Sequence, residues 1–155
     1  MIDISINKIF TLVTGISVAS LSLFEMVLPG NTADRTHENV KAVIEKFIKA
    51  GDKCDGTQLN ELLHSNFRVV ANQLMGGTDV TIITKEQYLS LIRDGKLGGD
   101  ERTYEILSLE VVNKNASAHV RIKGKVLSFD TFYHLIQLPE GIWQLVQDLP
   151  HATKN

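Results

Sequence analysis

Cysteine is nearly absent from this 155-residue sequence, and the single Cys54 excludes an intramolecular disulfide and a zinc cluster built on several thiolates. A basic excess is also missing: 16 Lys and Arg stand against 18 Asp and Glu, which is not the composition of a nucleic-acid-binding protein. The sequence contains no glycine-rich phosphate loop, nucleophile elbow or metal-type histidine spacing. We therefore expect no nucleic-acid partner, no metal and no cofactor.

Long apolar runs are lacking except near the N-terminus, at residues 9–24. This length suits the hydrophobic part of a secretory signal peptide, because a membrane span needs about 20 residues. We predict that residues 1–30 are a signal peptide or N-terminal hydrophobic segment and that residues 31–37 are a linker. The protein is then secreted or periplasmic, with no stable membrane span in the mature domain. A cytoplasmic protein with an N-terminal helix and an N-terminally anchored protein are the alternatives.

Three helices are predicted in the remaining domain, residues 38–150. The first carries apolar residues at the spacing of one helix face: Val40, Val43, Ile44, Phe47 and Ile48. Thr36 is its expected N-cap, and Gly51 is expected to end it. Thr57 is the expected cap of a short second helix. Thr84 and Gln87 have capping-box spacing at the start of a third helix.

Six strands complete the pattern. They are predicted at residues 67–74, 80–83, 104–112, 116–122, 129–138 and 142–149. Residues 116–122 alternate, with Ala118 and Val120 on one face and His119 and Arg121 on the other, so that one face is buried and one is wet. Residues 139–141 are a turn, and residues 151–155 a tail. The class is therefore α+β, with a mostly antiparallel sheet.

Four short motifs carry a resemblance to a known superfamily. They are residues 59–67, 83–88, 129–135 and 141–146. With the order of elements, they resemble the nuclear-transport-factor-2-like superfamily, in particular its lumazine-binding-like subgroup (SnoaL-like cone fold). The resemblance covers residues 38–149 and implies three helices packed on a strongly curved sheet. The superfamily includes isomerases, dehydratases, cyclases and binding modules, so the fold does not define the activity. Its isomerases and cyclases place an acid or base on the first long strand, and residues 67–72 offer none.

One candidate catalytic pair lies in the C-terminal hairpin. If Leu138 opposes Ile142 across the turn, His134 and Asp148 share one face as diagonal neighbours. A carboxylate beside an imidazole raises the imidazole pKa and fixes its tautomer, as a general base requires. His134 as base, oriented by Asp148, predicts an isomerase, dehydratase or cyclase. The alternative is a purely structural pair.

An aromatic ligand pocket is the leading functional hypothesis. Its candidate lining consists of Tyr88, Tyr104, Phe132, His134 and Trp143. Arg68 or Arg93 is a candidate partner for an anionic group. Such a lining suits a planar ligand, although each ring can equally pack in the core. We therefore predict a small-molecule-binding domain without demonstrated catalysis, and the sequence leaves open whether the protein is an enzyme. A third alternative is a scaffold whose interior is filled by its own side chains.

Both faces of the C-terminal hairpin carry apolar residues. Phe132 and Ile136 are on one face, and Tyr133, Leu135 and Leu145 are on the other. A hairpin with one solvated face should alternate more sharply between apolar and polar residues. Helices can cover one side, and a second subunit can cover the other. Dimers through the sheet are also common in the resembling superfamily, so we predict a homodimer of this kind.

Overall fold

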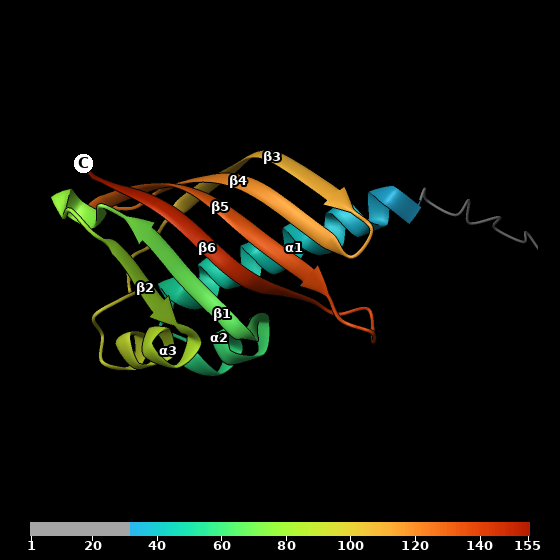
Figure 1. Cartoon of the computed structure of the whole chain (residues 1–155), viewed down its shortest axis with the longest axis horizontal. Coiled ribbons are helices and arrows are strands. Elements are labelled where there is room, and N and C mark those ends of the chain that lie inside the picture. Colours follow the sequence, from blue (N-terminus) through green and yellow to red (C-terminus); the bar gives the residue numbers. More distant parts are fainter. Residues whose placement is uncertain (1–31) are drawn as a thin grey trace, which may run out of the picture.

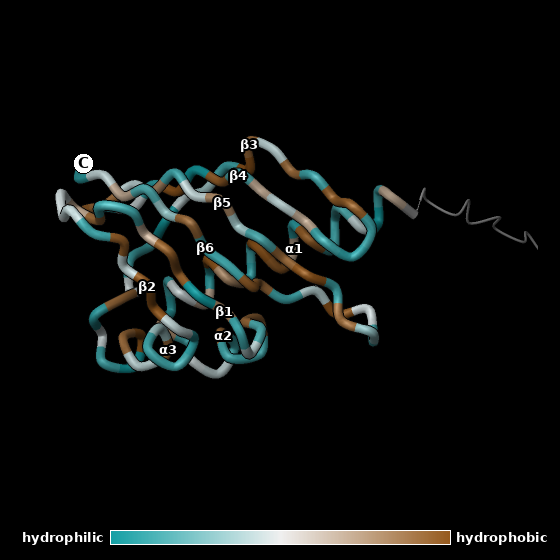
Figure 2. Tube along the Cα trace, viewed as in Figure 1, coloured by the Kyte–Doolittle hydropathy of each residue, from teal (hydrophilic) through white to brown (hydrophobic). Residues whose placement is uncertain are grey.

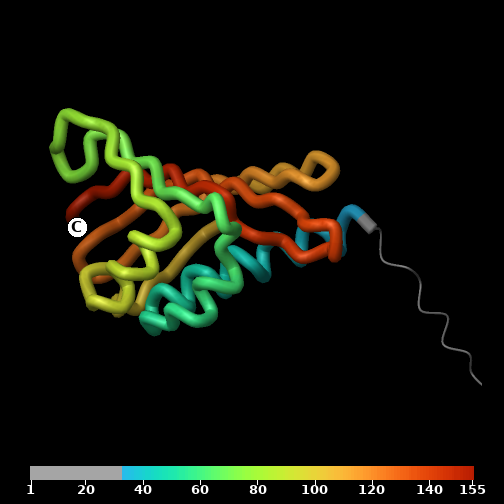
Figure 3. Tube along the Cα trace, turned by 60° about the horizontal axis from the view of Figure 1, so that its bottom comes forward, coloured from blue at the N-terminus to red at the C-terminus, as the bar shows by residue number. Residues whose placement is uncertain are grey.

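The computed structural model describes residues 32–155, and the predicted N-terminal segment 1–30 lies outside them (Figure 1). The elements in chain order are α1 (Thr32–Asp52), α2 (Gly56–Leu62), β1 (Leu63–Asn72), the 3₁₀ turn η1 (Leu74–Gly76), β2 (Val80–Thr84), α3 (Lys85–Arg93), β3 (Thr103–Val112), β4 (Asn115–Lys123), β5 (Leu127–Gln137) and β6 (Trp143–Lys154). The helices lie on one side of the sheet, as Figure 3 shows. The predicted α+β class and cone-like architecture are confirmed.

The described strands form one sheet in the order β2-β1-β6-β5-β4-β3. Every neighbouring pair is antiparallel except β1 and β6, which are parallel. The last strand therefore lies in the middle of the sheet, between the β1–β2 pair and the β3–β4–β5 meander. The mostly antiparallel sheet is as predicted, but chain order alone does not indicate the parallel β1–β6 neighbours.

Helix α1 presents its predicted apolar stripe to the sheet. Val40, Ile44, Phe47 and Ile48 are at most 4% exposed. The helix begins at Thr32 and not after Thr36, so most of the predicted linker 31–37 is helical. Residues 32–37 contain neither proline nor glycine, and therefore nothing in them stops the helix from extending toward the N-terminus.

The two shorter helices show how local sequence sets helix starts. Helix α2 is capped by Asp55, whose Oδ1 accepts a 2.9 Å hydrogen bond from Gln58 N, and not by the predicted Thr57. Asp and Thr both cap well, and the earlier of the two residues provides the cap here. The predicted capping box of α3 is confirmed: Thr84 N donates to Gln87 Oε1 at 2.9 Å, and Gln87 N donates to Thr84 Oγ1 at 3.4 Å.

Two strands extend beyond their predicted ends. β1 begins at Leu63, directly after α2, and not at Phe67. β6 continues to Lys154, so the predicted tail 151–155 is mostly strand. The reason is pairing with β5, which continues as far as Leu127 opposite Lys154. Hydropathy changes from residue to residue along these strands in Figure 2, as expected where one face is buried.

The core lies between the inner face of the sheet and the helices. Its centre holds four aromatic rings: Phe47 of α1, Phe67 of β1, Tyr88 of α3 and Tyr133 of β5. Phe47 contacts Tyr133 edge-on with ring centroids 5.4 Å apart, and it stacks on Tyr88 at 6.1 Å. Edge-on and offset contacts of this kind stabilise a core beyond the area they bury. This ring cluster borders the candidate site.

Candidate functional site

A β-bulge at Val146 decides which face of the sheet Asp148 occupies. Close to the turn, Leu135 pairs with Leu145, which is the predicted register. The register then shifts by one residue, and Tyr133 pairs with Asp148. Because side chains alternate along a strand, one extra residue turns the rest of β6 over. The Asp148 side chain therefore lies on the inner face, and the residue is 9% exposed.

The predicted His134–Asp148 pair on one face is wrong. His134 pairs with Gln147 on β6 and with Ser117 on β4. The side chain of Ser117 points away from the inner face, because its neighbours Ala116 and Ala118 are buried there. His134 is therefore on the outer face, opposite to the face of Asp148. The prediction assumed a continuous register from the turn, which the bulge breaks.

Asp148 is a carboxylate held in an apolar interior. Thr131 Oγ1 donates a short hydrogen bond to Asp148 Oδ1, and Oδ2 has no donor among the described residues. Burial raises the pKa of Asp148 to about 7, against the opposing effects of the Thr131 hydrogen bond and the Arg102 charge. Asp148 can thus accept or donate a proton near neutral pH.

Two tyrosines lie beside this carboxylate. Burial raises the pKa of Tyr88 and of Tyr133, and the negative charge of Asp148 raises both further. Both hydroxyls therefore stay protonated over the physiological range. Neither hydroxyl makes a hydrogen bond to another residue in the described part of the chain, although Tyr133 is only 2% exposed. They are hydrogen-bond donors without a protein acceptor.

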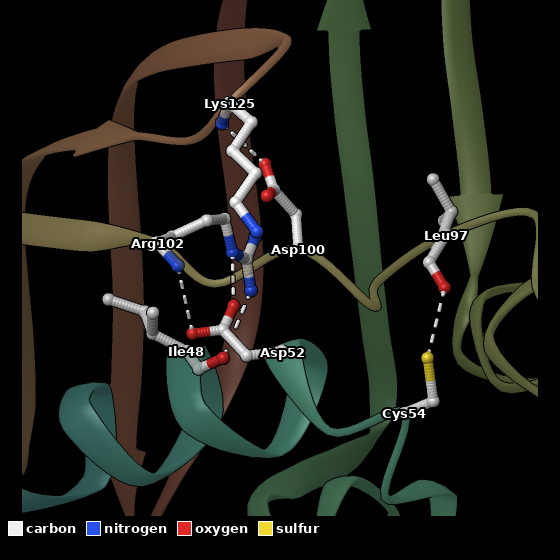
Figure 4. Close-up of polar contacts among 7 residues, drawn as sticks. All are labelled: Ile48, Asp52, Cys54, Leu97, Asp100, Arg102 and Lys125. Atoms are coloured by element: carbon white, nitrogen blue, oxygen red, sulfur yellow. Dashed lines mark hydrogen bonds and ion pairs between the residues drawn. The ribbon is translucent and has the colours of Figure 1, made fainter.

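An ion pair joins Asp52 at the end of α1 to Arg102 (Figure 4). Arg102 Nε donates to Asp52 Oδ1 at 2.5 Å, and its Nη2 donates to the Ile48 carbonyl at 3.0 Å. The two side chains are only 17% and 15% exposed. The Arg102 charge acts on Asp148, Tyr88 and Tyr133, and in each case it favours the ionised form.

The loop carrying Arg102 is tied to the end of α1 by close backbone contact. Gly99 N donates to the Gly51 carbonyl at 3.1 Å. Gly98 has φ +81°, and a Cβ there would lie 2.3 Å from the Gly51 carbonyl oxygen. At the far side of the loop, Lys125 N donates to Asp100 Oδ2 at 2.8 Å (Figure 4). Glycine is required at residue 98 both for its conformation and for this approach.

The arrangement can bind a ligand and can move a proton. Its polar atoms are an acceptor or donor at Asp148 and donors at Tyr88 and Tyr133, set among aromatic rings. A few polar groups in an apolar setting are typical of small-molecule sites. Among residues 32–155, no group of three or more His, Cys, Asp or Glu side chains is placed to hold a metal ion.

Comparison with known proteins places the chain in a family. Residues 35–149 match the family model described as "Putative lumazine-binding". The chain belongs to this family. A search of curated proteins finds no match.

Solved structures share the fold of this family member at low sequence identity. A nuclear-transport-factor-2-like protein of unknown function from Shewanella baltica OS155 has a TM-score of 0.70 and 20% identity, over 81% of this chain and 100% of that one. Another, from Silicibacter pomeroyi DSS-3, has 0.68 and 18%, over 80% and 100%. A ketosteroid isomerase-like protein from Erwinia carotovora atroseptica SCRI1043 has 0.60 and 11%, over 76% and 96%. These similarities show the nuclear-transport-factor-2-like fold.

The five residues predicted to line one pocket lie in different places in this nuclear-transport-factor-2-like domain. Tyr88 joins Asp148, while Tyr104 is a partly buried residue near Glu45 and Lys49. Trp143 is buried on the inner face beside α1 and α2. Phe132 and His134 are on the outer face, where Phe132 is 46% exposed and stacks on His119 with centroids 4.6 Å apart.

Neither of the two candidate anion partners makes a hydrogen bond or an ion pair with Asp148 among the described residues. Arg68 is exposed on the outer face, paired with Gln147, and Arg93 is the exposed last residue of α3. Sequence reasoning missed Tyr133, Thr131 and Arg102. Tyr133 was assigned to the face opposite Asp148, and Arg102 is 50 positions from Asp52, so no local pattern links the two.

Two surface hollows accompany the interior site. One, of about 600 Å³, surrounds Arg68 on the outer side of β1 and β2. The other, of about 530 Å³, lies between α1, α2 and the β5–β6 turn and is lined partly by Trp143. Neither is lined by Asp148, Tyr88 or Tyr133.

No helix in residues 32–155 combines the length and apolar character of a membrane span.

Proposed function

We propose that this domain binds a small planar molecule with a polar edge in its interior, beside Asp148. The observation that carries the proposal is a set of three polar groups without protein partners: Asp148 Oδ2 and the hydroxyls of Tyr88 and Tyr133. None of the three is among the fully buried unpaired side-chain atoms of residues 32–155, so each keeps some accessible surface, and a bound ligand could reach and pair them. The family description agrees with a flat heteroaromatic ligand.

Solvent access and the neighbouring rings support the same proposal. Asp148 is 9% exposed and Tyr88 is half-buried, so solvent reaches both residues. The rings of Phe47 and Phe67 adjoin Tyr88 and give the hydroxyl an aromatic surrounding. A ligand with both donor and acceptor groups on one edge would match two hydroxyl donors and one carboxylate.

Calorimetric titration with flavins, pteridines and other planar heteroaromatic compounds tests the proposal. Asp148→Asn should weaken binding at least about tenfold at pH 8, because it removes a charge-assisted hydrogen bond. Asp130→Asn makes the same chemical change on the outer face of β5 and should bind as the wild type does. The proposal fails if no such compound binds, or if both variants bind with wild-type affinity.

A second candidate function is acid–base catalysis by Asp148. A pKa of about 7 suits a group that exchanges protons near neutral pH, and the adjacent tyrosine hydroxyls can donate to a developing oxyanion. This replaces the earlier hypothesis of His134 as base. Proton exchange between solvent and a carbonyl compound, followed by NMR in D₂O, should depend on Asp148. Equal exchange by Asp148→Asn would exclude this role.

We also propose a homodimer through the outer face of the sheet. Apolar residues meet there across neighbouring strands: Val70 pairs with Ile82, and Phe132 pairs with Leu149. Ile82 is 59% and Phe132 is 46% exposed. Polar residues flank them, including Arg121 and Asp130, which form an ion pair. An apolar centre with a polar rim is the usual composition of a subunit interface.

Export from the cytoplasm stays a proposal that rests on the apolar run at residues 9–24. N-terminal sequencing of the native protein tests it. A mature N-terminus between about residues 22 and 34 is expected if the segment is a cleaved signal peptide. A native protein that keeps residue 1 and remains in the soluble cytoplasmic fraction would contradict export.

A further inference from the structure

Thr131 occupies one of the two carboxyl oxygens of Asp148. Its Oγ1 donates a short hydrogen bond to Asp148 Oδ1, and no other donor in residues 32–155 reaches this carboxyl group. Thr131 is 1% exposed and lies between Val120 of β4 and Pro150 of β6. A hydrogen bond in such a close-packed position fixes the rotation of the carboxyl group. Oδ2 is then the oxygen that remains for a ligand.

Two tyrosine hydroxyls lie close to the same carboxyl group. Tyr133 is directly opposite Asp148 on β5, and Tyr88 comes from α3, with both rings in contact with Phe47. Burial raises the pKa of each hydroxyl, and the Asp148 charge raises it further, so both keep their protons at neutral pH. Neither hydroxyl oxygen is among the fully buried unpaired atoms of the described chain. Both protons are therefore available to an acceptor on a ligand.

The balance of donors and acceptors at the site restricts the ligand. The protein offers two O–H donors and one carboxylate oxygen, so the matching edge has one N–H and two acceptors. An imide carries this set on a single flat edge, because its ring N–H stands between two carbonyl groups. An edge with two parallel N–H donors, such as an amidine, pairs with both oxygens of a carboxylate, and Thr131 already uses one of them.

We propose that the interior site recognises the imide edge of a planar ring, and that Thr131 sets this specificity. The inference rests on the proposed function, since it names the ligand class of the same site. The imide N–H donates to Asp148 Oδ2, and the two carbonyls accept from Tyr88 and Tyr133. An amino group in place of one carbonyl would place a donor against a tyrosine hydroxyl. That hydroxyl can accept the hydrogen bond, but its own proton then has no acceptor, which weakens binding.

Three bicyclic compounds of nearly equal size test these contacts separately. Quinazoline-2,4-dione has the imide, its 3-methyl derivative lacks the imide N–H, and 2-aminoquinazolin-4-one has an amino group in place of one carbonyl. Calorimetric titration is best made at pH 8, where Asp148, with a pKa of about 7, is mostly ionised. The dione should bind at least about tenfold more tightly than either of the other compounds, because each of them leaves one polar group unpaired.

Variants of Thr131 test its role in specificity. Thr131→Val keeps the shape of the side chain and frees Asp148 Oδ1, so the preference for the dione over the amino compound should narrow by about tenfold. Thr131→Ser keeps the hydroxyl and should keep the wild-type preference. A purely structural effect would weaken both compounds alike and leave the ratio of their affinities unchanged.

The tyrosines are tested in the same titrations. Tyr133→Phe removes one donor and should weaken dione binding about tenfold. Tyr104→Phe makes the same change at a tyrosine near Glu45 and Lys49, outside the site, and should bind as the wild type does.

The outcomes separate this inference from the proposed function. If the 3-methyl derivative or the amino compound binds as tightly as the dione, the imide proposal is overturned while the proposed function stands. The same holds if the dione does not bind but another planar heteroaromatic compound does. An unchanged preference in Thr131→Val would overturn the role of Thr131 in specificity. If no planar heteroaromatic compound binds, both proposals fail.

Discussion

Asp148 lies directly opposite Tyr133 across the β5–β6 ladder, and both side chains face the interior between sheet and helices. Directly opposite side chains on one face are close enough to interact strongly. The Asp148 charge accordingly raises the pKa of the Tyr133 hydroxyl, so that the two groups prefer not to ionise together. Protonation of Asp148 removes this effect on Tyr133.

Asp148 should make the protein less stable as pH rises from about 4 to about 7. Its pKa is raised from 3.8 to about 7, so in this range the unfolded chain loses the proton while the folded chain keeps it. Asp148→Asn lacks this penalty. Its stability relative to wild type should increase by roughly 2–3 kcal/mol between about pH 5 and pH 8, measured by urea unfolding.

Asp130→Asn is the control for that measurement, and its effect has the opposite sign. The His119 hydrogen bond lowers the pKa of Asp130, so its ionised form stabilises the fold above the unfolded pKa and that contribution is lost in acid. The variant should therefore not gain stability toward pH 8. A wild type and Asp148→Asn with parallel pH profiles would contradict the pKa of Asp148 and its burial.

Removing the Arg102 guanidinium should be costly. Arg102→Gln leaves the Asp52 carboxylate, 15% exposed, without its cation, and it leaves the Ile48 carbonyl without its donor. We expect a loss of about 3 kcal/mol in unfolding free energy, because a largely buried charge is left unpaired. Lys41→Gln breaks the exposed pair with Glu38 and should cost under about 0.5 kcal/mol. Similar losses in the two variants would show that the Arg102 pair is not structurally important.

Alanine substitutions at two glycines of one loop distinguish the cost of backbone strain from the cost of a steric clash. Gly95 has φ +67° and open space around it, so Gly95→Ala should cost only about 1 kcal/mol. Gly98→Ala adds a methyl group 2.3 Å from the Gly51 carbonyl oxygen, and the loop must move. We expect its melting temperature to fall by several times as much. Equal shifts in a calorimetric melt would mean that residues 98 and 51 are not in contact in solution.

The dimer proposal predicts a mass change on mutation of the outer face. The wild type should have the mass of two protomers in light scattering at micromolar concentration. Phe132→Asp places a charge in the apolar centre of the face and should give monomers. Val126→Asp, at a turn residue that is 68% exposed, should leave the mass unchanged. A wild-type mass of one protomer would exclude the dimer.

Features encoded by neighbouring residues were predictable from the sequence. The Thr84–Gln87 capping box and the apolar stripe of α1 follow from spacings of three and four residues, and both are present. The register next to the turn was also predictable, because Leu135 and Leu145 are set by the short loop between them. Local geometry leaves few alternatives at these positions.

The interior site depended on features without a local sequence pattern. Nothing in the residues around Val146 marks it as the extra residue of a bulge, yet that bulge turns Asp148 inward. The Asp52–Arg102 pair forms only when the loop after α3 meets the end of α1. The parallel pairing of β1 with β6 is likewise decided by packing of the complete sheet. Such features are set by tertiary contacts, and propensity or periodicity does not reveal them.

The position of β6 in the sheet order has a consequence for how the chain folds. The strand is made last in the described chain, yet it joins β1–β2 on one side to β3–β4–β5 on the other. Until residues 143–154 leave the ribosome, those two half-sheets have no hydrogen-bonded connection, and each exposes an edge that β6 will cover. Pairing β1 with β6 brings together residues that are far apart in the sequence, and such long-range pairing is slow. Until it occurs, the unpaired strand edges can pair with other chains. The sheet is therefore expected to be completed only once β6 is available, and the risk of aggregation should be greatest just before β6 inserts.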